Sequence, residues 1–169
     1  IIDHVDGIRD IERRLIRAVG EPLERFEEDR LRMMRGVRFT ANLGFELDPT
    51  TEGAICSEAR HLPAVSPERI RVELIKVLRG PRPHVGMELL RTTGLLQTFL
   101  PEILDQIGCQ QSEQHHPEGD VWTHTLKMLE IMARDAGEAG EPVSPHLALA
   151  VLLHDIAKPA TRTEGPDRI

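Results

Sequence analysis

Apolar residues recur at three- and four-residue steps along most of this chain, which is the spacing of one face of a helix. The clearest example lies in residues 25–45, where Gly44 supplies a natural stop. The apolar stripe of this segment consists of Leu31, Met34, Val37 and Ala41. Aromatic residues make up only 3% of the sequence, and β-branched residues form no alternating runs. The pattern therefore predicts an all-α fold.

Capping residues and helix breakers set the bounds of the other expected helices. Asp48, Ser66 and Ser144 each precede a proline, and Asp120 precedes an apolar run, as helix N-caps do. Residues 1–5 are expected to be the last strand of a preceding domain, followed by a turn. The run 147–153 is apolar on every side, so we expect it to be buried. The expected helices, with their caps, cover residues 8–19, 48–62, 66–80, 83–93, 120–137 and 144–153.

These elements divide into three expected regions. The first covers residues 1–63 and the second, a helical body, covers residues 64–109. The third covers residues 110–169 and begins with the amide-rich stretch 110–114, which has the composition of a linker.

Charge and cysteine content narrow the possible roles of the chain. The formal net charge of -7 argues against a generally basic nucleic-acid binder, but the arginines crowd into the first half. A local basic face can bind phosphates on an acidic protein.

Cys56 and Cys109 lie far apart, so we expect a reducing, cytoplasmic setting. No apolar run is long enough to cross a membrane, and the start at Ile1 reads as part of a longer protein.

Candidate chemistry gathers around the stripe of residues 25–45. Asp29, Arg32 and Arg35 are three residues apart and are expected on one helix face. A carboxylate only accepts hydrogen bonds and a guanidinium only donates them. Such a set can distinguish adenine and cytosine, which carry an exocyclic amine, from guanine and uracil, which carry a carbonyl oxygen there. The alternative is a salt bridge within the helix, which contributes a few tenths of a kcal/mol.

The first third of the chain closely resembles the neck of class II tRNA nucleotidyltransferases and bacterial poly(A) polymerases. The motifs are D-G-I-R-D-I (6–11), I-R-A-V-G-E-P (16–22), R-F-E-E-D-R-L-R (25–32), R-G-V-R-F (35–39) and L-G-F (43–45). The resemblance implies that Asp29 and Arg32 read the base of incoming ATP or CTP, and that Arg35 and Arg38 position the nucleotide or brace these side chains. Arg30 departs from the family, which usually has proline there.

The same resemblance extends into the body. V-S-P-E-R-I-R (65–71) and L-L-R-T-T-G-L-L (89–96) resemble the segment that follows the neck in these enzymes. Arg69, Arg71 and Lys76 are candidates for contacts with an RNA backbone, with a solvated charged face as the alternative. In the family, carboxylates of an N-terminal head hold Mg²⁺ ions. Since no Gly-Ser followed by Asp-x-Asp occurs here, no catalytic residue is assigned and the chain alone is not expected to transfer nucleotides.

Histidines gather in the last third of the chain. His124, His154 and Asp155 are candidate ligands of a divalent transition metal, because imidazole and carboxylate suit such ions. W-T-H (122–124) and L-H-D-I-A-K (153–158) resemble the start of HD-family metal phosphohydrolases, in which an aspartate further along completes the site. Asp167 is expected in a surface loop instead, so the site reads as incomplete and a hydrogen-bonded His-Asp pair is an equal alternative. His115 and His116 are expected on the surface.

Three hypotheses for the function follow. The leading one is a neck, body and truncated HD-type region of an enzyme that adds CCA or poly(A) to RNA 3′ ends. Its expected partners are tRNA or other RNA 3′ ends, ATP and possibly CTP, with no membrane. The alternatives are an HD-type phosphohydrolase and a helical RNA-binding scaffold without enzymatic activity. The sequence does not decide between CCA addition and poly(A) addition, and it does not indicate the oligomeric state.

Overall fold

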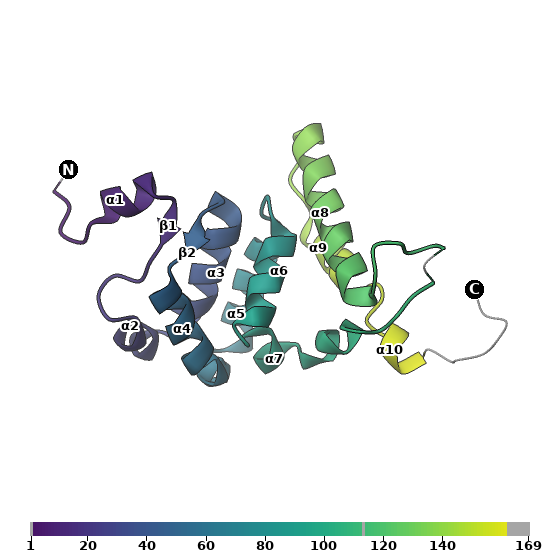
Figure 1. Ribbon diagram of the computed structural model, residues 1–169, viewed down its shortest axis with the longest axis horizontal. Helices are drawn as coiled ribbons and strands as arrows, with labels where there is room; N and C mark the ends of the chain where they lie inside the picture. The colour runs from purple at the N-terminus through teal and green to yellow at the C-terminus, as the bar shows by residue number, and fades with distance from the viewer. Residues whose placement is uncertain (1, 113, 162–169) are drawn as a thin grey trace.

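The computed structural model describes residues 2–112 and 114–161. The helices stand side by side in a row, with α1 at one end and α10 at the other (Figure 1). The elements are, in order, α1 (Gly7–Glu12), β1 (Leu15–Ile16), α2 (Pro22–Glu28), α3 (Leu31–Leu43), β2 (Glu46–Leu47), α4 (Pro49–Glu58), the 3-10 helix η1 (Ala59–Ala64), α5 (Pro67–Leu78), α6 (Pro83–Thr92), α7 (Leu96–Phe99), the 3-10 helix η2 (Pro101–Gln106), α8 (Val121–Ala139), α9 (Pro145–Leu153) and α10 (Lys158–Thr161). The prediction of an all-α fold is confirmed in its main feature, with one short strand pair in addition.

The beginning of the chain differs from the prediction. The helix expected over residues 8–19 ends at Glu12, and β1 follows it and pairs in parallel with β2. Ile8 is 46% exposed and Ile11 is 66% exposed, so α1 buries little apolar surface that would favour a longer helix. Residues 2–5 form no strand, and Ile1 lies outside the described residues.

The segment 25–45 is two helices instead of one. α2 ends at Glu28, Asp29 is extended (φ -152°, ψ 104°), and α3 begins at Leu31. The Asp29 side chain accepts a hydrogen bond from the Leu31 amide at 3.1 Å. An aspartate that bonds a nearby amide in this way competes with helical hydrogen bonding, which explains the break. Asp29 therefore lies at the junction of α2 and α3.

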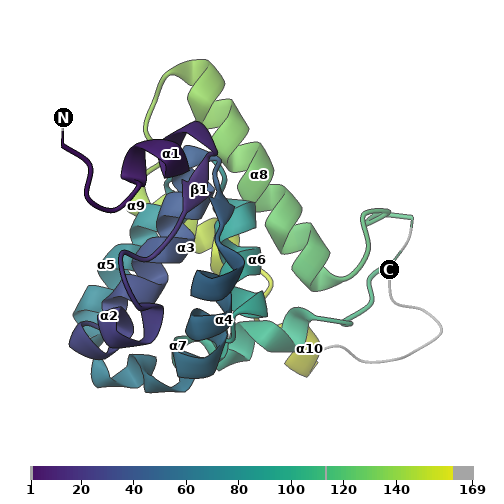
Figure 2. The same ribbon diagram turned by 60° about the vertical axis from the view of Figure 1, so that its left-hand side comes forward.

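α3 lies at the centre of the first part of the molecule and packs against both α5 and α6 (Figure 2). Met33, Met34 and Val37 on α3 are fully buried. The close approach of the helices depends on Gly86 of α6, because a Cβ atom there would lie 2.4 Å from Cγ1 of Val77. A small residue at this crossing thus sets the distance between α5 and α6.

Several predicted helix starts are confirmed. The side chains of Asp48, Asp120 and Ser144 each accept a hydrogen bond from an amide of the first turn, whereas Ser66 makes no such bond. The helix expected to end at Pro63 becomes η1 after Glu58. α8 runs past the predicted end at Gly137 to Ala139.

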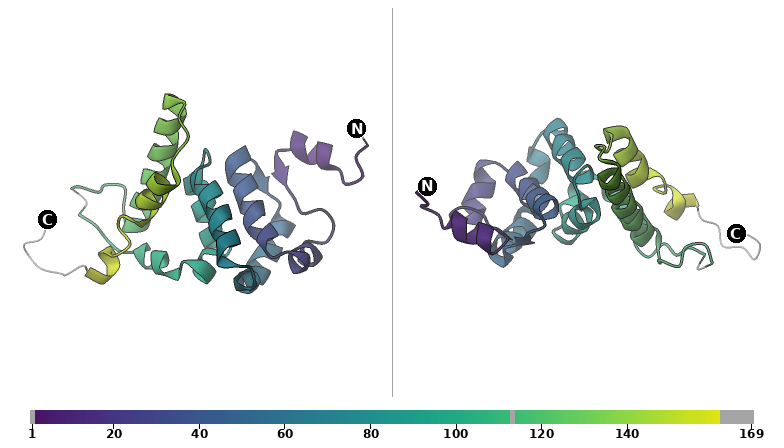
Figure 3. Two further views of the ribbon diagram at one scale, coloured as in Figure 1. Left: turned by 180° about the vertical axis from the view of Figure 1, so that it is seen from behind. Right: turned by 90° about the horizontal axis from the view of Figure 1, so that it is seen from above.

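The prediction that residues 147–153 are buried on all sides is wrong. Ala148 and Leu152 of α9 are buried, but Leu147 is 50% exposed. α9 packs against α8 and α5, and Leu147 lies on a part of its surface that this packing leaves exposed (Figure 3).

The last helices join the body directly. α8 packs against α6, and one cluster of buried side chains runs from Phe26 to Leu152. α9 packs against α5, and there Nε of Arg79, at the end of α5, donates to the Val143 carbonyl oxygen, just before α9, at 2.5 Å. The division at residues 63 and 109 remains a prediction. Among the described residues, no helix has the length and apolar character needed to span a membrane.

Candidate nucleotide-binding junction and histidine cluster

Asp29 is held at the α2–α3 junction by two hydrogen-bond donors. Besides the Leu31 amide, Nη2 of Arg69 donates to Oδ1 at 3.2 Å and to Oδ2 at 2.9 Å. Burial raises the pKa of Asp29, but the hydrogen bonds from Leu31 and Arg69 together outweigh burial and hold this pKa below its ordinary value. Asp29 is therefore a charged acceptor, half-buried at the surface.

Only one of the two expected arginines faces Asp29. Nη1 of Arg35 lies 3.9 Å from Oδ2 of Asp29. Nη1 of Arg32 instead donates to Oε2 of Glu28 at 2.6 Å and to the Arg25 carbonyl oxygen at 3.3 Å. The break between α2 and α3 separates Asp29 from the face of α3, which is why the expected single face is not formed.

Arg38 connects α3 to α5. Its Nη1 lies 2.7 Å from Oε2 of Glu73, and both side chains are largely buried, at 14% and 3% exposed. Its guanidinium carbon also lies 4.4 Å from the centre of the Phe39 ring. Glu73 has a second partner, Nζ of Lys76, at 3.0 Å. These contacts suit a bracing role for Arg38.

The three basic residues of α5 do not form one surface. Arg69 and Lys76 are seven residues apart and lie on the same face, and each pairs with an acid, Asp29 and Glu73 respectively. Arg71 lies on another face, is exposed and has no ion-pair partner among the described residues. It lines a mostly apolar groove of about 350 Å³ between η1, α5 and α7.

The predicted metal ligands meet at one place. Donor atoms of His124 on α8, His154 at the end of α9 and Asp155 all lie within 4.8 Å of one another. Nδ1 of His154 donates to the Val151 carbonyl oxygen at 2.8 Å. Oδ2 of Asp155 is buried and lies 2.7 Å from Nζ of Lys158, but in a direction that forms no hydrogen bond. A metal ion here remains a prediction, and Asp167 lies outside the described residues.

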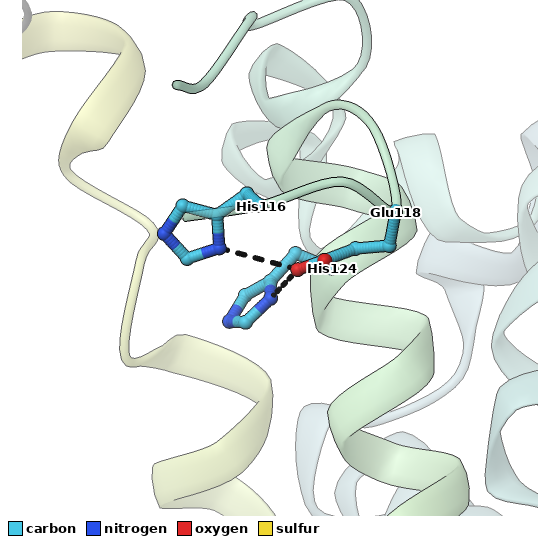
Figure 4. A group of neighbouring side chains, drawn as sticks. All are labelled: His116, Glu118 and His124. Carbon is cyan, nitrogen blue, oxygen red and sulfur yellow. Dashed lines mark hydrogen bonds and ion pairs between the residues drawn. The ribbon is translucent and has the colours of Figure 1, made fainter. Parts of the chain in front are cut away.

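A second group near His124 was missed from the sequence. Oε1 of Glu118 lies 2.5 Å from Nδ1 of His124 and 3.2 Å from Nδ1 of His116 (Figure 4). The hydrogen bond from its own backbone amide, followed by those from His124 and His116, lowers the pKa of Glu118 to about 2. His115 is exposed as expected, and His116 lies half-buried at the surface. The stretch H-P-E-G-D (116–120) is the signal that sequence reasoning overlooked.

Comparison with known proteins gives a consistent set of relatives. Residues 44–107 match the family model described as "Probable RNA and SrmB- binding site of polymerase A". The CCA-adding enzyme of Levilactobacillus brevis is 49% identical over 105 residues, which are 62% of this chain and 26% of that protein. The multifunctional CCA protein of Methylococcus capsulatus is 37% identical over 169 residues, covering 97% of this chain and 38% of that protein.

Solved structures agree with these relatives. A structure described as a tRNA-processing enzyme in an apo form aligns with a TM-score of 0.64 at 26% identity, covering 90% of this chain and 41% of that one. The CCA-adding enzyme of Bacillus stearothermophilus in complex with CTP aligns with a TM-score of 0.55 at 27% identity, covering 95% of this chain and 49% of that one. The chain thus spans between a quarter and a half of the length of these proteins.

Proposed function

We propose, from the membership of this chain in the family of CCA-adding enzymes and bacterial poly(A) polymerases, that it selects the incoming nucleotide and binds RNA during nucleotide addition to an RNA 3′ end. The curated relatives are named for CCA addition, which favours tRNA as the RNA and ATP and CTP as the nucleotides. The same names do not favour the alternative of a phosphohydrolase.

The main support for base selection is the charged carboxylate of Asp29, which lies beside Arg35 at the α2–α3 junction. A carboxylate has about four acceptor sites. Arg69 and Leu31 use three of them in the hydrogen bonds described above. One acceptor site is therefore left for the exocyclic amine of adenine or cytosine, while a carbonyl oxygen of guanine or uracil would be repelled.

Arg32 can add a donor to this site. Both of its hydrogen bonds use Nη1, so Nε and Nη2 remain for the ring acceptor of a base. Arg32 also lies within the first turn of α3, next to the junction. In this proposal Arg32 turns from Glu28 toward Asp29 when a nucleotide binds. Asp29 and Arg32 would then read adjacent groups on one base edge, and Arg35 and Arg38 would keep them in place.

Transfer itself needs groups that this chain does not supply. Nucleotidyl transfer uses Mg²⁺ ions held by paired carboxylates, and the sequence has no Asp-x-Asp pair. The residues described above therefore bind and select, and we assign no step of the chemistry to them.

A transfer assay on the protein that contains this chain tests base selection. With a tRNA that lacks its 3′ CCA and each of the four triphosphates, Asp29→Ala should reduce the preference for ATP and CTP roughly ten- to a hundredfold, the range for one specific base contact. Glu27→Ala is the matched control, because Glu27 is an exposed acid of α2 with no ion pair among the described residues. Unchanged selectivity in Asp29→Ala would contradict the assignment.

For RNA binding, Arg71 is the strongest candidate on α5 because its charge is not matched by an acid. Each phosphate contact contributes roughly 0.7–0.9 to the slope of log affinity against log salt. Arg71→Ala should reduce the slope for tRNA by about this amount, whereas Arg134→Ala on α8, outside the matched residues 44–107, should not. An equal slope for Arg71→Ala and the unaltered chain would exclude this contact.

A further inference from the structure

Arg30 follows Asp29 directly in the sequence, but the two side chains bind to different helices. Nη1 of Arg30 pairs with Oε2 of Glu58, the last residue of α4. The Asp29 carboxylate is bound by Arg69 of α5 instead. Among the described residues, no ion pair joins Arg30 to Asp29. The α2–α3 junction is therefore tied to α4 by one residue and to α5 by the next.

Glu58 is well placed to hold a cation. Its side chain is 20% exposed and that of Arg30 is 23% exposed, so the pair is partly shielded from water. Nδ1 of His61 lies 2.9 Å from the same oxygen of Glu58. The hydrogen bonds from His61 and then from Arg30 hold the pKa of Glu58 below 4.5, its ordinary value. Glu58 is therefore a carboxylate at neutral pH and attracts the Arg30 guanidinium.

A guanidinium on Asp29 would interfere with base selection. Arg69 and Leu31 leave one acceptor site of Asp29 for an exocyclic amine. If Arg30 donated to that site, the carboxylate would offer nothing to adenine or cytosine. The other donors of Arg30 would then bind the carbonyl oxygen of guanine or uracil. A free Arg30 would thus reverse the preference that Asp29 creates.

Arg30 is close enough in the chain to make this contact. Neighbouring residues form such a pair elsewhere in the molecule, since Nε and Nη2 of Arg134 donate to Oδ1 of Asp135 at 3.1 and 2.8 Å. What keeps Arg30 from Asp29 is its ion pair with Glu58. Loss of the Glu58 charge would release the guanidinium next to the base-reading carboxylate.

We propose that Glu58 is a positioning residue for base selection, because it holds the Arg30 guanidinium on α4 and keeps the last acceptor site of Asp29 open to the amine of ATP or CTP. This inference rests on the proposed role of Asp29 in base selection. Glu58 contacts no base in this arrangement and acts only through Arg30, which lies 28 positions earlier in the chain.

The backbone at residue 30 allows the guanidinium to be removed without loss of the junction. Arg30 has a φ of -57°, and Asp29 is extended. Proline favours the first conformation, and the residue before a proline favours the second. The Arg30 amide makes no backbone hydrogen bond within the described part of the chain, so no bond is lost to a proline. Arg30→Pro therefore removes the cation and retains the course of the backbone.

Transfer assays on the protein that contains this chain test the proposal, with a tRNA that lacks its 3′ CCA and each of the four triphosphates. Glu58→Gln should raise KM for ATP and CTP roughly two- to fivefold, the range for competition by one exposed ion pair. It should also lower their preference over GTP and UTP. Glu58→Gln/Arg30→Pro should restore both quantities, because no guanidinium remains to compete. Glu58→Gln/Arg30→Met repeats this test without a new backbone constraint.

Two controls separate this role from a structural one. Glu52→Gln removes the other acid of α4, which has no ion pair among the described residues, and His61→Gln removes the second partner of Glu58. Both should leave the preference unchanged. A loss in Glu58→Gln that neither Arg30→Pro nor Arg30→Met reverses would overturn the proposal, because the loss would then belong to the packing of α4.

Asp29→Ala, measured in the same assay, distinguishes failure of this inference from failure of the proposed function. If Asp29→Ala loses the preference and Glu58→Gln keeps it, the proposed function stands and the inference is wrong. If Asp29→Ala keeps the preference, the proposed function itself is wrong. If both variants lose it, Glu58→Gln added to Asp29→Ala should cause no further loss, because Glu58 acts through the acceptor site of Asp29. An additive loss would overturn the inference.

Discussion

Arg69 on α5 donates to both carboxylate oxygens of Asp29, at 3.2 and 2.9 Å. The two residues are 40 positions apart in the sequence, and the pair joins α5 to the junction that we propose for base selection. A change in the position of Arg69 would therefore alter the number of acceptor sites that Asp29 offers to a base. This ion pair is a physical link between the position of α5 and the acceptor sites of Asp29.

The link makes the pKa of Asp29 depend on Arg69. In Arg69→Ala we expect this pKa to rise toward 3.8, its ordinary value, because only the Leu31 amide and the charge of Arg35 would then oppose the effect of burial. The pKa of Asp29 is lower in the folded state than in the unfolded state, so its carboxylate stabilises the fold above about pH 3.8. This stabilisation is lost as the pH falls through the pKa of the folded state. In Arg69→Ala the stabilisation should be lost at a higher pH than in the unaltered chain. NMR titration of the carboxyl carbon measures the shift, and Arg71→Ala should leave it unchanged.

Removal of Arg38 should destabilise the fold. Glu73 is 2% exposed, and loss of Arg38 leaves its charge with Lys76 as the one remaining partner that we observe. Removal of one partner of a buried ion pair lowers the free energy of unfolding by about 3–5 kcal/mol. Because Lys76 still pairs with Glu73, we expect the loss in Arg38→Met to lie near the lower end of this range. Urea denaturation measures the loss.

Lys76→Ala is the matched control for this experiment, because its side chain is 49% exposed. An exposed partner contributes about 1 kcal/mol or less. Equal losses in Arg38→Met and Lys76→Ala would show that burial of the Arg38–Glu73 pair has no energetic consequence.

The helix crossing at Gly86 predicts a large difference between two glycine substitutions. A Cβ at Gly86 would lie 2.4 Å from Val77 and 3.2 Å from Ala41, so Gly86→Ala should destabilise by about 1–3 kcal/mol through overpacking. Gly53 in α4 has no atom within 4 Å of such a Cβ, so Gly53→Ala should stabilise by about 0.5–1 kcal/mol. Thermal unfolding of both variants provides the comparison, and a stabilised Gly86→Ala would contradict the observed packing.

The single tryptophan should report the protonation of Glu88. Nε1 of Trp122 donates to Oε2 of Glu88 at 3.0 Å, which joins α8 to α6. The hydrogen bond from Arg91 is the main cause that lowers the pKa of Glu88 below 4.5. The hydrogen bond from Trp122 to the charged Glu88 carboxylate is therefore present above about pH 4.5. It is lost as the pH falls through the pKa of Glu88 in the folded state, which is lower.

Trp122 fluorescence should accordingly change with a midpoint below pH 4.5, and Arg91→Ala should raise that midpoint. Glu88→Gln should abolish the transition. Far-UV circular dichroism over the same range separates it from acid unfolding. A transition that persists in Glu88→Gln would assign it to another group.

Local features of the sequence determined most of the secondary structure and the family. The caps Asp48, Asp120 and Ser144 act within their own first turns, so three or four consecutive residues contain the information that positions them. The three-to-four spacing likewise identified the buried face of α3. The motifs of residues 6–45 indicated the family for the same reason, since they are contiguous.

Tertiary structure decided which side chains meet. The Asp29–Arg69 and Arg38–Glu73 pairs exist because α3 packs against α5, and periodicity indicates a buried face without naming its partner. The exposure of Leu147 depends on such neighbours too, whereas the break at Asp29 has a local cause, the hydrogen bond to the Leu31 amide. Glu118 meets His116 and His124 because backbone bonds from Gly108 and Val121 fold the loop onto α8, a set of contacts between residues that no local rule relates.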